Sequence, residues 1–424
     1  MSRVTAIIAE FNPFHNGHAD LLNELRAKDP DARIIVLMSG NFVQRGEPAV
    51  MDKHRRARAA LSAGADLVLE LPVLYSIAPA ELYARGAIHT LNALGIVDRI
   101  AFGSESGDLA ALQYAADELS GSQTQDPVFH DTMTSFLRSG MTYPKAFSAS
   151  VRSLSPGKAR EDIVRLMEDP NNLLGIEYLK SLRQTDSRIE PLTIRRSPQS
   201  DRILSASEIR KVIHDAGLPE ERKGLLSQLS SVMPEGSFRE LQAITGVPDD
   251  PDGIVERPVF SDDLSGILSY CLTMSDPDGY VDFGDINEDL ANRIENCRSQ
   301  CHGFDQFAAL VKTKSITLAR VRRCLIQLIL GLKRDLREEM LDHRATVIRV
   351  LGFRGAAREL LKQIGVHASV PMILRGTDYR KVLEDNDLRP LVRLDFKANA
   401  LYDQLAILSG ERVAEAAKPP VIME

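Results

Sequence analysis

Two histidines, three residues apart and with a glycine between them, stand near the start of the chain. They are His15 and His18 of the stretch FNPFHNGH, which begins at Phe11 directly after an apolar segment. At the first turn of a helix this spacing places both imidazoles on one side, and Gly17 allows close backbone approach. Backbone N–H groups and the helix dipole favour an anion at such a turn. The stretch therefore predicts a site for phosphate groups.

A simpler alternative is an ordinary strand-to-helix turn, in which Asn16 caps the helix and the histidines are only packed or solvated. The elements on either side favour the phosphate site. Residues 4–8 (VTAII) predict a strand, and residues 18–30 predict a helix with Leu21, Leu22 and Leu25 on one face. The order strand, HxGH and helix is the arrangement that a phosphate site requires.

Short apolar runs alternate with helical stretches through the first two hundred residues. Further strands are predicted at residues 33–40, 65–72, 98–105 and 188–197, with a helix at 52–64. This alternation is typical of an α/β fold, here a Rossmann-like parallel sheet covered by helices. Residues 109–169 carry a helical pattern without strand signals, which indicates an insertion.

From about residue 218 the pattern changes to amphipathic helices without a convincing βαβ unit. The sequence therefore predicts an α/β nucleotide-binding domain over residues 1–217 and a mainly α-helical domain over residues 218–424. Residues 248–253 (PDDPDG) predict a loop inside the second domain. The last residues, AKPPVIME, predict a loose tail.

Charge and composition limit the possible classes of protein. The 424 residues include 52 basic and 59 acidic side chains, for a net charge of −7. This balance argues against a protein that coats nucleic acid generally, but it leaves room for a local basic face. The apolar stretch near the start is too short for a signal peptide or a membrane span. We expect a cytoplasmic protein without a membrane partner, and we infer no oligomeric state.

The four cysteines lie in the second half of the chain without a CxxC pair. Cys297 and Cys301 could share a helix face with His302 nearby, but no fourth metal ligand stands beside them. We expect reduced thiols in the core, and we predict no metal site built by the protein.

A second polar motif, LSASEIRK, begins at Leu204. Hydroxyl groups and a guanidinium at this spacing suit phosphate, because the start of a helix and these side chains offer donors together. The alternative is an ordinary capped helix, since Ser205 and Glu208 form a capping box. The hydroxyl groups and the guanidinium of this motif belong to Ser205, Ser207 and Arg210.

HxGH after a first strand, followed by SASEIR, resembles the nucleotidyltransferase superfamily. The second motif is similar to its ISSTxxR element, with Ala206 as a departure. Longer segments resemble the bacterial tRNA(Met) cytidine acetate ligase family in the same order, through Phe353. They are MSGNFVQRGEPAVMDKHRRARAALSAGADLVLELP, PNNLLGIEYLK, IRRS, LVKTKSITLARVRRCLI and VIRVLGF.

This resemblance implies an ATP-dependent ligase. It would join acetate to the N4 amine of the wobble cytidine of elongator tRNA(Met) through an acetyl-adenylate. The partners implied are ATP, acetate and tRNA(Met), with Mg²⁺ carried by ATP.

The resemblance also implies a set of ATP-binding residues. Gly103 follows a strand and has no side chain to obstruct an adenosine, and the two arginines suit phosphate or adenine. The motif leaves open whether Asn171 or Asn172 makes the contact, and we favour Asn171. The whole set is Ile7, Ile8, Ala9, Glu10, Phe11, Asn12, Pro13, Phe14, His15, Asn16, Gly17, His18, Ala19, Asp20, Gly103, Asn171, Arg195, Arg196, Ser205 and Ser207.

Four residues are candidates for catalysis, namely His15, His18, Lys53 and Arg210. Acetate is ionised at pH 7 and needs alignment and positive charge more than a base. Lys53 belongs to a polar group after the second strand that could fix acetate or guide tRNA. The alternative is a well-bonded loop with a solvated basic helix face. The other members are Ser39, Asn41, Gln44, Arg45 and Arg56, whereas Asp66 and Glu70 are expected to be structural.

The stretch KTKSITLARVRR stands out from the acidic chain. Backbone phosphate is the natural partner of clustered lysine and arginine, so we expect tRNA contacts here. The alternative is a solvated helix face. The candidates are Lys312, Lys314, Arg320, Arg322 and Arg323, with possible extensions at Lys333, Arg334, Arg349 and Arg354.

Two other functions fit parts of the sequence. A small-metabolite adenylyltransferase of the same superfamily would carry both HxGH and SxSxxR, but the long helical half weighs against it. A non-catalytic ATP- or tRNA-binding protein would have less reason to retain both phosphate-binding elements.

Overall fold

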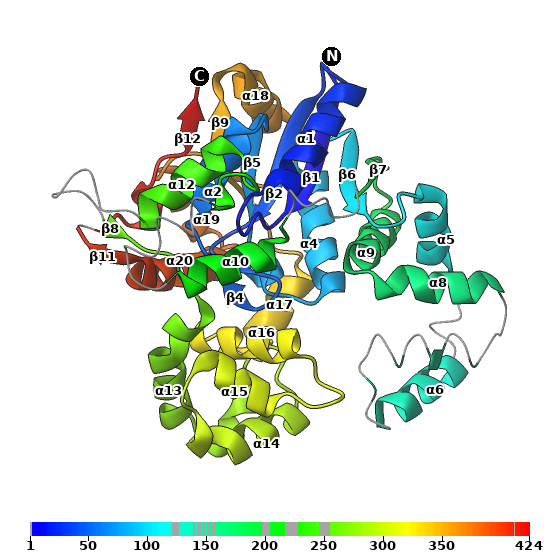
Figure 1. Ribbon diagram of the computed structural model, residues 1–424, viewed down its shortest axis with the longest axis vertical. Coiled ribbons are helices and arrows are strands. Elements are labelled where there is room, and N and C mark those ends of the chain that lie inside the picture. Colours follow the sequence, from blue (N-terminus) through cyan, green and yellow to red (C-terminus); the bar gives the residue numbers. More distant parts are fainter. Residues whose placement is uncertain are drawn as a thin grey trace.

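An eight-stranded sheet forms the centre of the computed structural model, which describes residues 2–120, 127–138, 141, 146, 149–150, 153, 158–196, 204–216, 228–245, 255–410 and 412–424. Its strand order is β10-β9-β5-β2-β1-β6-β7, and β12 also pairs with β9 (Figure 1). The strands are β1 (Val4–Ala9), β2 (Arg33–Ser39), β5 (Leu67–Leu71), β6 (Arg99–Ser104), β7 (Glu190–Arg195), β9 (Ile348–Arg354), β10 (Met372–Ile373) and β12 (Val421–Met423).

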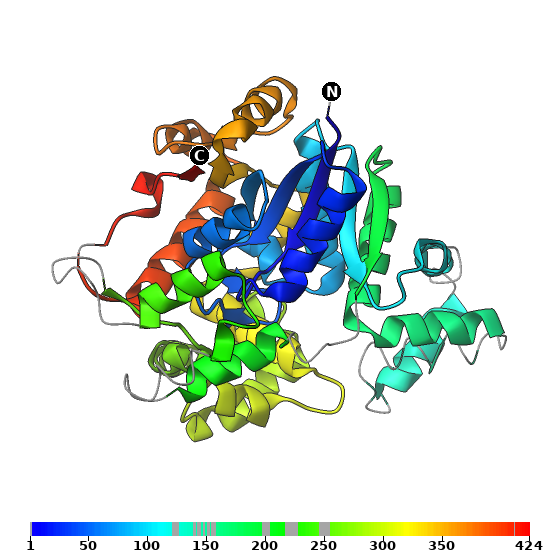
Figure 2. The ribbon, with the colours of Figure 1, turned by 45° about the horizontal axis from the view of Figure 1, so that its top comes forward.

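The five strands predicted from the sequence are all present, and they pair in parallel. Alternate residues of β2 enter two different cores. Ile35 and Leu37 join the core under α4 (Ala80–Ala93) and α9 (Pro170–Gln184). Ile34 and Val36 join the core under α1 (Asn16–Lys28) and α2 (Lys53–Ser62). Because helices cover both faces, the strands are apolar throughout, and this is why they could be predicted. Figure 2 shows α1 across one face.

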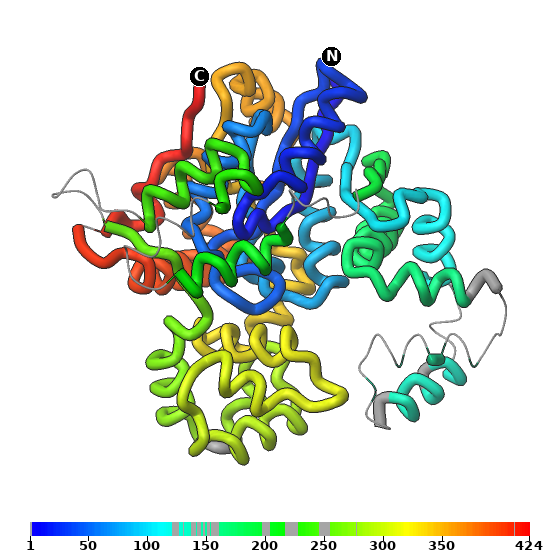
Figure 3. Tube along the Cα trace, viewed as in Figure 1, coloured from blue at the N-terminus to red at the C-terminus, as the bar shows by residue number. Residues whose placement is uncertain are grey.

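The insertion predicted at residues 109–169 is helical in its described parts. Its helices are α5 (Leu109–Ser120), α6 (Pro127–Arg138) and α8 (Lys158–Glu168). α5 lies beside the β7 edge of the sheet, and both α5 and α8 pack on α9, whereas α6 lies farther from the sheet (Figure 3).

A helical group follows in the second half of the chain, as predicted. It consists of α13 (Ser265–Met274), α14 (Glu288–Cys297), α15 (Phe304–Val311), α16 (Leu318–Ile329) and α17 (Arg334–Asp342), with 3-10 turns η1 (Ser261–Leu264), η2 (Pro277–Asp282) and η3 (Arg298–Gln300). The group lies at the end of the molecule toward which β1 runs (Figure 1). The predicted loop 248–253 and the predicted boundary at 217/218 lie outside the described residues, so the division into two domains stays a prediction.

The chain after the helical group returns to the sheet, and here the sequence prediction is wrong. β9 pairs antiparallel with β5, while β10 and β12 pair parallel with β9. No strand was predicted after residue 218, and the tail was expected to be loose. A short apolar run such as IRVLGF reads equally as a strand or a buried helix until its partner is known, and the three residues of β12 carry no periodicity. The remaining elements of this part are α18 (Arg358–His367), α19 (Asp378–Glu384), α20 (Arg389–Ala406), β11 (Ile407–Ser409), η4 (Gly355–Ala357) and η5 (Glu415–Ala417).

A buried cluster of charges fastens this C-terminal part to the sheet. Lys53 is completely buried, and its Nζ lies 2.7 Å from Oε2 of Glu70 and 2.8 Å from Oε1 of Glu415. Arg349 of β9 lies beside the same Glu415 and donates to the Lys418 carbonyl. The prediction that Lys53 is a catalytic residue is therefore corrected, because its ammonium group donates to the buried carboxylates of Glu70 and Glu415. Arg349 is likewise unavailable to nucleic acid.

None of the helices in the described part of the chain is long and apolar enough to cross a membrane. The four cysteines are free thiols, with Cys297 and Cys324 buried. Among the described residues, no three His, Cys, Asp or Glu side chains group so that they could hold a metal ion.

The buried cluster predicts a large loss of stability when its cation is removed. Lys53→Met would leave Glu70 and Glu415 buried without their partner, and breaking such a pair costs about 3–5 kcal/mol. We expect a matching loss of unfolding free energy in urea titrations. Arg58→Ala is the matched control on the same helix, because the Arg58 side chain is 45% exposed in its pair with Glu240. It should cost at most about 1 kcal/mol. Equal losses in the two variants would contradict the assignment.

Candidate active site

The FNPFHNGH stretch lies at the carboxyl end of β1. β2 pairs with one edge of β1 and β6 with the other. The chain therefore reverses its direction across the sheet at β1, and ligands of open α/β sheets bind in the crevice at such a switch point. Phe11 has a positive φ of 50°, and the peptide bond between Asn12 and Pro13 is cis. His15 follows this turn as the N-cap residue of α1.

The two histidines cap α1 reciprocally. Nδ1 of His15 accepts the Gly17 N–H at 3.1 Å, and Nδ1 of His18 accepts the His15 N–H at 3.3 Å. The rings stack with their centroids 3.8 Å apart. Since both Nδ1 atoms accept, each neutral ring carries its proton on Nε2, which remains a donor. The alternative that Asn16 caps the helix is wrong, because its side chain donates to the Ser231 carbonyl at 2.9 Å.

Burial keeps both imidazoles neutral. It lowers the pKa of His15 to about 4, with a smaller contribution from the positive charge of Arg196. The pKa of His18 is well below its ordinary value, first because of burial and then because of His15 and Arg196. Two neutral rings can stack without repulsion, and each can donate one N–H to an anion at pH 7.

The backbone amides of this turn are not free, which corrects one part of the prediction. The N–H of His15 is bonded to His18, that of Gly17 to His15, and that of Asn16 to the Val232 carbonyl at 3.0 Å. The donors that this turn could still offer to a phosphate are therefore the imidazole N–H groups. Two of these amides are bonded by the histidines themselves, and the third is covered by a distant segment that the sequence did not reveal.

That segment is residues 228–245, which includes α12 (Glu235–Thr245). Besides the two carbonyls bonded to Asn16, Ser237 Oγ donates to the Phe14 carbonyl at 2.7 Å. Its Val232 and Met233 belong to a small apolar cluster with Ile209 of the second motif. Site prediction missed these supporting residues, since serine and apolar residues in a helical stretch carry no chemical signal.

The second motif begins α10 (Ala206–Asp215), and the predicted capping box is confirmed. Ser205 Oγ accepts the Glu208 N–H at 3.3 Å, and the Glu208 carboxylate accepts the Ser205 N–H at 2.7 Å. The hydroxyl of Ser205 thus serves the helix in this structure.

Arg210 joins the two motifs across 198 positions of sequence. Its Nη1 donates to the Asn12 carbonyl at 2.8 Å, and its Nη2 lies 2.7 Å from Oε1 of Glu47. Ser207 Oγ accepts from Arg45 at 2.9 Å. The start of α10 therefore faces the FNPFHNGH turn, with two guanidinium groups between them.

Gly103, at the end of β6, leaves room for a third guanidinium group. A Cβ at this position would lie 3.2 Å from Cγ of Arg196, so the glycine lets the Arg196 side chain cross the strand end. Arg195 and Arg196 are exposed at the end of β7, next to β6. Arg196 is close enough to both histidines to lower their pKa values. The structure therefore brings Arg196 together with His15 and His18, and Gly103 lies against Arg196.

Asn171 and Asn172 both donate hydrogen bonds to the Glu105 carboxylate, but only Asn171 is half-exposed. Asn171 Nδ2 donates to Glu105 Oε1 at 2.6 Å, and the Asn172 N–H donates to Oε2 at 3.0 Å. The Asn172 side chain is buried, and it bonds both the Ser106 N–H and Asp169. The geometry therefore favours Asn171 as the residue that can turn to a ligand.

The polar group after β2 divides into buried and accessible members. Asn41 is buried and bonds Asp52, Asn399 and the Lys53 N–H. The buried Arg56 donates to the carbonyls of Glu10, Ser39, Gly40 and Met51. The alternative of a solvated basic face on α2 is thus wrong as well. Arg45 is exposed beside the second motif, as described above.

The basic stretch of α16 lies next to this site. Gly46, with φ +75°, turns the hairpin of β3 (Phe42–Val43) and β4 (Glu47–Pro48) against it, and a Cβ there would lie 2.5 Å from the Arg323 nitrogen. Arg323 donates to the Gln44 carbonyl at 3.1 Å, and Arg322 Nη2 lies 2.8 Å from Asp305 Oδ1. Both are engaged within the protein.

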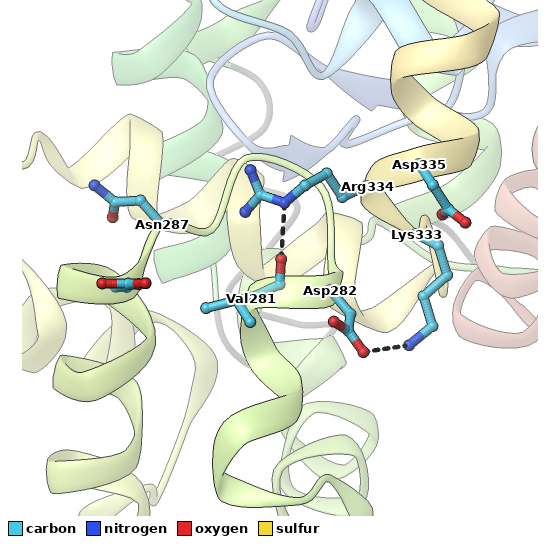
Figure 4. Close-up of a pocket in the computed structure, with 7 residues that line it drawn as sticks. Val281, Asp282, Asn287, Lys333, Arg334 and Asp335 are labelled. Carbon is cyan, nitrogen blue, oxygen red and sulfur yellow. Dashed lines mark hydrogen bonds and ion pairs between the residues drawn. The ribbon is translucent and has the colours of Figure 1, made fainter.

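Other basic candidates differ in exposure. Lys312 and Lys314 are exposed, and Arg320 is half-exposed beside Asp285. Lys333 and Arg334 line a polar groove of about 790 Å³ between η2, α14 and α17 (Figure 4). There Arg334 donates to the Val281 carbonyl at 2.9 Å, and Lys333 lies 3.7 Å from Asp282. Arg334 is thus engaged within the protein, whereas the Lys333 side chain is 48% exposed, so the extension of the basic face to Lys333 stays a prediction.

Comparisons with known proteins agree with this geometry. A family model described as HIGH Nucleotidyl Transferase matches residues 2–415. The tRNA(Met) cytidine acetate ligase of Alkaliphilus metalliredigens is 34% identical over 94% of this chain and 93% of its own. That of Acetivibrio thermocellus is 34% identical over 94% of both. The chain belongs to this family of HIGH nucleotidyl transferases.

A solved structure is similar over the whole chain. It is the crystal structure of Thermotoga maritima TmcAL bound with alpha-thio ATP, with a TM-score of 0.86 and 30% identity over 99% of both chains. The apo form of the same protein gives a TM-score of 0.85. The predicted Rossmann-like nucleotidyltransferase fold with an added helical part is confirmed.

The buried neutral His15 predicts a pH-dependent stability. Its folded pKa of about 4 lies below the unfolded value near 6.5, so the unfolded chain takes up the proton first as the pH falls. Stability is complete above about pH 6.5 and is lost as the pH falls toward 4. This group should remove about 2 kcal/mol of unfolding free energy between pH 7 and pH 5.

Urea titrations of His15→Asn at both pH values test this contribution, because asparagine keeps a cap acceptor and does not titrate. The variant should show a smaller pH dependence than the wild type. His367→Asn, which alters an exposed histidine, is the matched control. An unchanged pH dependence in His15→Asn would contradict a buried neutral ring.

Proposed function

We propose that this chain is an ATP-dependent acetate ligase that forms acetyl-adenylate and acetylates N4 of the wobble cytidine of elongator tRNA(Met). The contact between Arg210 and the Asn12 carbonyl carries the proposal, because it brings the SASEIR helix to face the histidine turn. A site between them would have cationic and neutral N–H donors on opposite sides. The similarity to tRNA(Met) cytidine acetate ligases and to an ATP-analogue complex supports ATP, acetate and this tRNA as substrates.

In the first step, acetate attacks the α-phosphorus of ATP and pyrophosphate leaves. Acetate is already ionised at pH 7, so this step needs alignment and positive charge rather than a base. We assign the Nε2–H groups of His15 and His18 to the phosphates nearest the reaction. Arg210 and Arg196 would neutralise the charge of the departing pyrophosphate. Mg²⁺ would arrive with the ATP phosphates and keep most of its waters.

In the second step, the N4 amine of cytidine attacks the acetyl carbonyl and AMP leaves. The base must leave the anticodon loop, which costs least for an unpaired nucleotide. We infer that the helical group binds the tRNA, with the exposed Lys312 and Lys314 and the half-exposed Arg320 contacting backbone phosphate. Arg322 and Arg323 would act by holding α16 against the hairpin beside the site. A tRNA substrate implies a cytoplasmic location.

The decisive test uses purified protein, ATP and labelled acetate. We expect acetate-dependent exchange of pyrophosphate into ATP, and labelled N4-acetylcytidine in tRNA(Met) after nucleoside analysis. Exchange that depends on a phosphorylated metabolite instead of acetate would support a small-metabolite adenylyltransferase. Absence of both activities from the wild-type protein would refute an enzymatic role of the site.

His18→Ala should nearly abolish adenylate formation. The change removes one N–H donor and also the acceptor of the His15 N–H. Loss of one such donor typically costs on the order of 2.7–4 kcal/mol, or about 10²–10³ in rate. Acetate-dependent pyrophosphate exchange measures the effect. The control is His367→Ala, which should exchange at the wild-type rate, and a small effect of His18→Ala would exclude its role at the phosphates.

The double variant Lys312→Ala/Lys314→Ala should weaken tRNA binding and leave ATP binding unchanged. Each lost phosphate contact should also reduce the slope of log affinity against log salt concentration by about 1. Binding is measured with labelled tRNA(Met) at several salt concentrations. Lys362→Ala on α18, where the Lys362 side chain is 75% exposed, controls for the loss of positive charge. The same slope in wild type and double variant would place the tRNA elsewhere.

A further inference from the structure

Glu10 is the residue between β1 and the FNPFHNGH turn, and its carboxylate is only half committed to the fold. One oxygen, Oε1, accepts the Gln44 N–H at 2.8 Å. The residue is half-buried. Because Glu10 directly follows β1, it lies at the switch point of the sheet, one residue before the turn that carries the histidines.

Charged and hydroxyl groups surround this carboxylate on two sides. Toward the second motif are Glu47, Arg45 and Arg210, and toward the core are the buried hydroxyls of Tyr83 and Tyr178. The guanidinium of Arg56 is also near, through its bond to the Glu10 carbonyl. Burial raises the pKa of Glu10, and Glu47 raises it further, while Arg45, the Gln44 N–H and Arg210 act in the opposite direction.

Other carboxylates beside the turn are already bound. Glu47 pairs with Arg210 at 2.7 Å and with Arg322 at 3.8 Å. Glu105 accepts from Asn171 and Asn172 with both of its oxygens. Among the ion pairs of the described residues, none includes Glu10. Of these three carboxylates, it is thus the one with an oxygen available to take up a proton.

We propose that Glu10 is the general base of the acetyl-transfer step, which rests on the function proposed above. The N4 lone pair forms a bond to the acetyl carbonyl carbon, and the bond from that carbon to the phosphate oxygen breaks. AMP leaves with the electron pair. The proton lost by N4 passes to the Glu10 carboxylate and then to solvent.

The environment of Glu10 suits a general base. A base is most effective when its pKa lies near the working pH, and an isolated surface glutamate is too weak. Partial burial beside Glu47 moves the pKa upward, while Arg45 and Arg210 keep the carboxylate ionised until a proton is available. Acetate activation needs no base, so the group is required only in the second step.

Glu10→Gln separates the two steps, because glutamine keeps the shape and the acceptor for the Gln44 N–H. We expect single-turnover transfer to tRNA(Met) to fall by about 100-fold or more, as for loss of a general base. Acetate-dependent pyrophosphate exchange should fall by less than about tenfold. Wild-type transfer should slow as the pH is lowered and Glu10 is protonated, and this dependence should disappear in the variant.

Three results would overturn the assignment. They are equal losses in the two steps, an unchanged pH profile in Glu10→Gln, or a higher KM for acetate with normal transfer. Glu105→Gln is the matched carboxylate control, and it should lower both steps by the same factor. If Glu10→Gln does not fold, Glu10→Asp and the wild-type profile decide, since wild-type transfer that does not slow as the pH is lowered excludes the base. Wild-type protein that lacks exchange and acetylation altogether would refute the proposed function instead.

Discussion

The reciprocal cap between His15 and His18 is the interaction on which the site depends. The His18 ring accepts the His15 N–H, and the His15 ring accepts the Gly17 N–H. The helix start and the two ring orientations are therefore fixed together. The same bonds put both protons on Nε2. Because burial keeps the rings neutral, they can stack at 3.8 Å and still present donors. The side chains that cap the helix are therefore the same ones whose Nε2–H groups are proposed to bind phosphate.

Three parts of the chain hold this cap in place. Arg56 ties the ends of β1 and β2 together through four carbonyl groups. Residues 228–245 occupy the Asn16 N–H and side chain from outside. Arg210 bonds the carbonyl of Asn12 from the second motif. Each contact fixes backbone atoms, which leaves the imidazole and guanidinium groups of the site to face a ligand.

Charge is used in two different ways in this fold. In the buried cluster, the Lys53 ammonium is paired with Glu70 and Glu415, and it fixes the C-terminal part to the sheet. The guanidinium groups of Arg45, Arg195 and Arg196 are exposed at the strand ends instead. Basic side chains are therefore either buried in ion pairs or exposed at strand ends, and sequence spacing alone does not separate the two cases.

The sequence by itself determined the parallel strands, the histidine turn and the capped SASEIR helix, because apolar periodicity and capping are local properties. It also contained both phosphate motifs. Tertiary structure alone decided that Arg210 meets Asn12 and that the Asn16 N–H is occupied by Val232, since these contacts join residues far apart in the chain. It likewise decided that Lys53 is buried and that β9 and β12 complete the sheet. The local sequence around a lysine that follows a strand does not show whether its side chain faces solvent or a buried carboxylate such as Glu415. Only the packing of distant segments decides this.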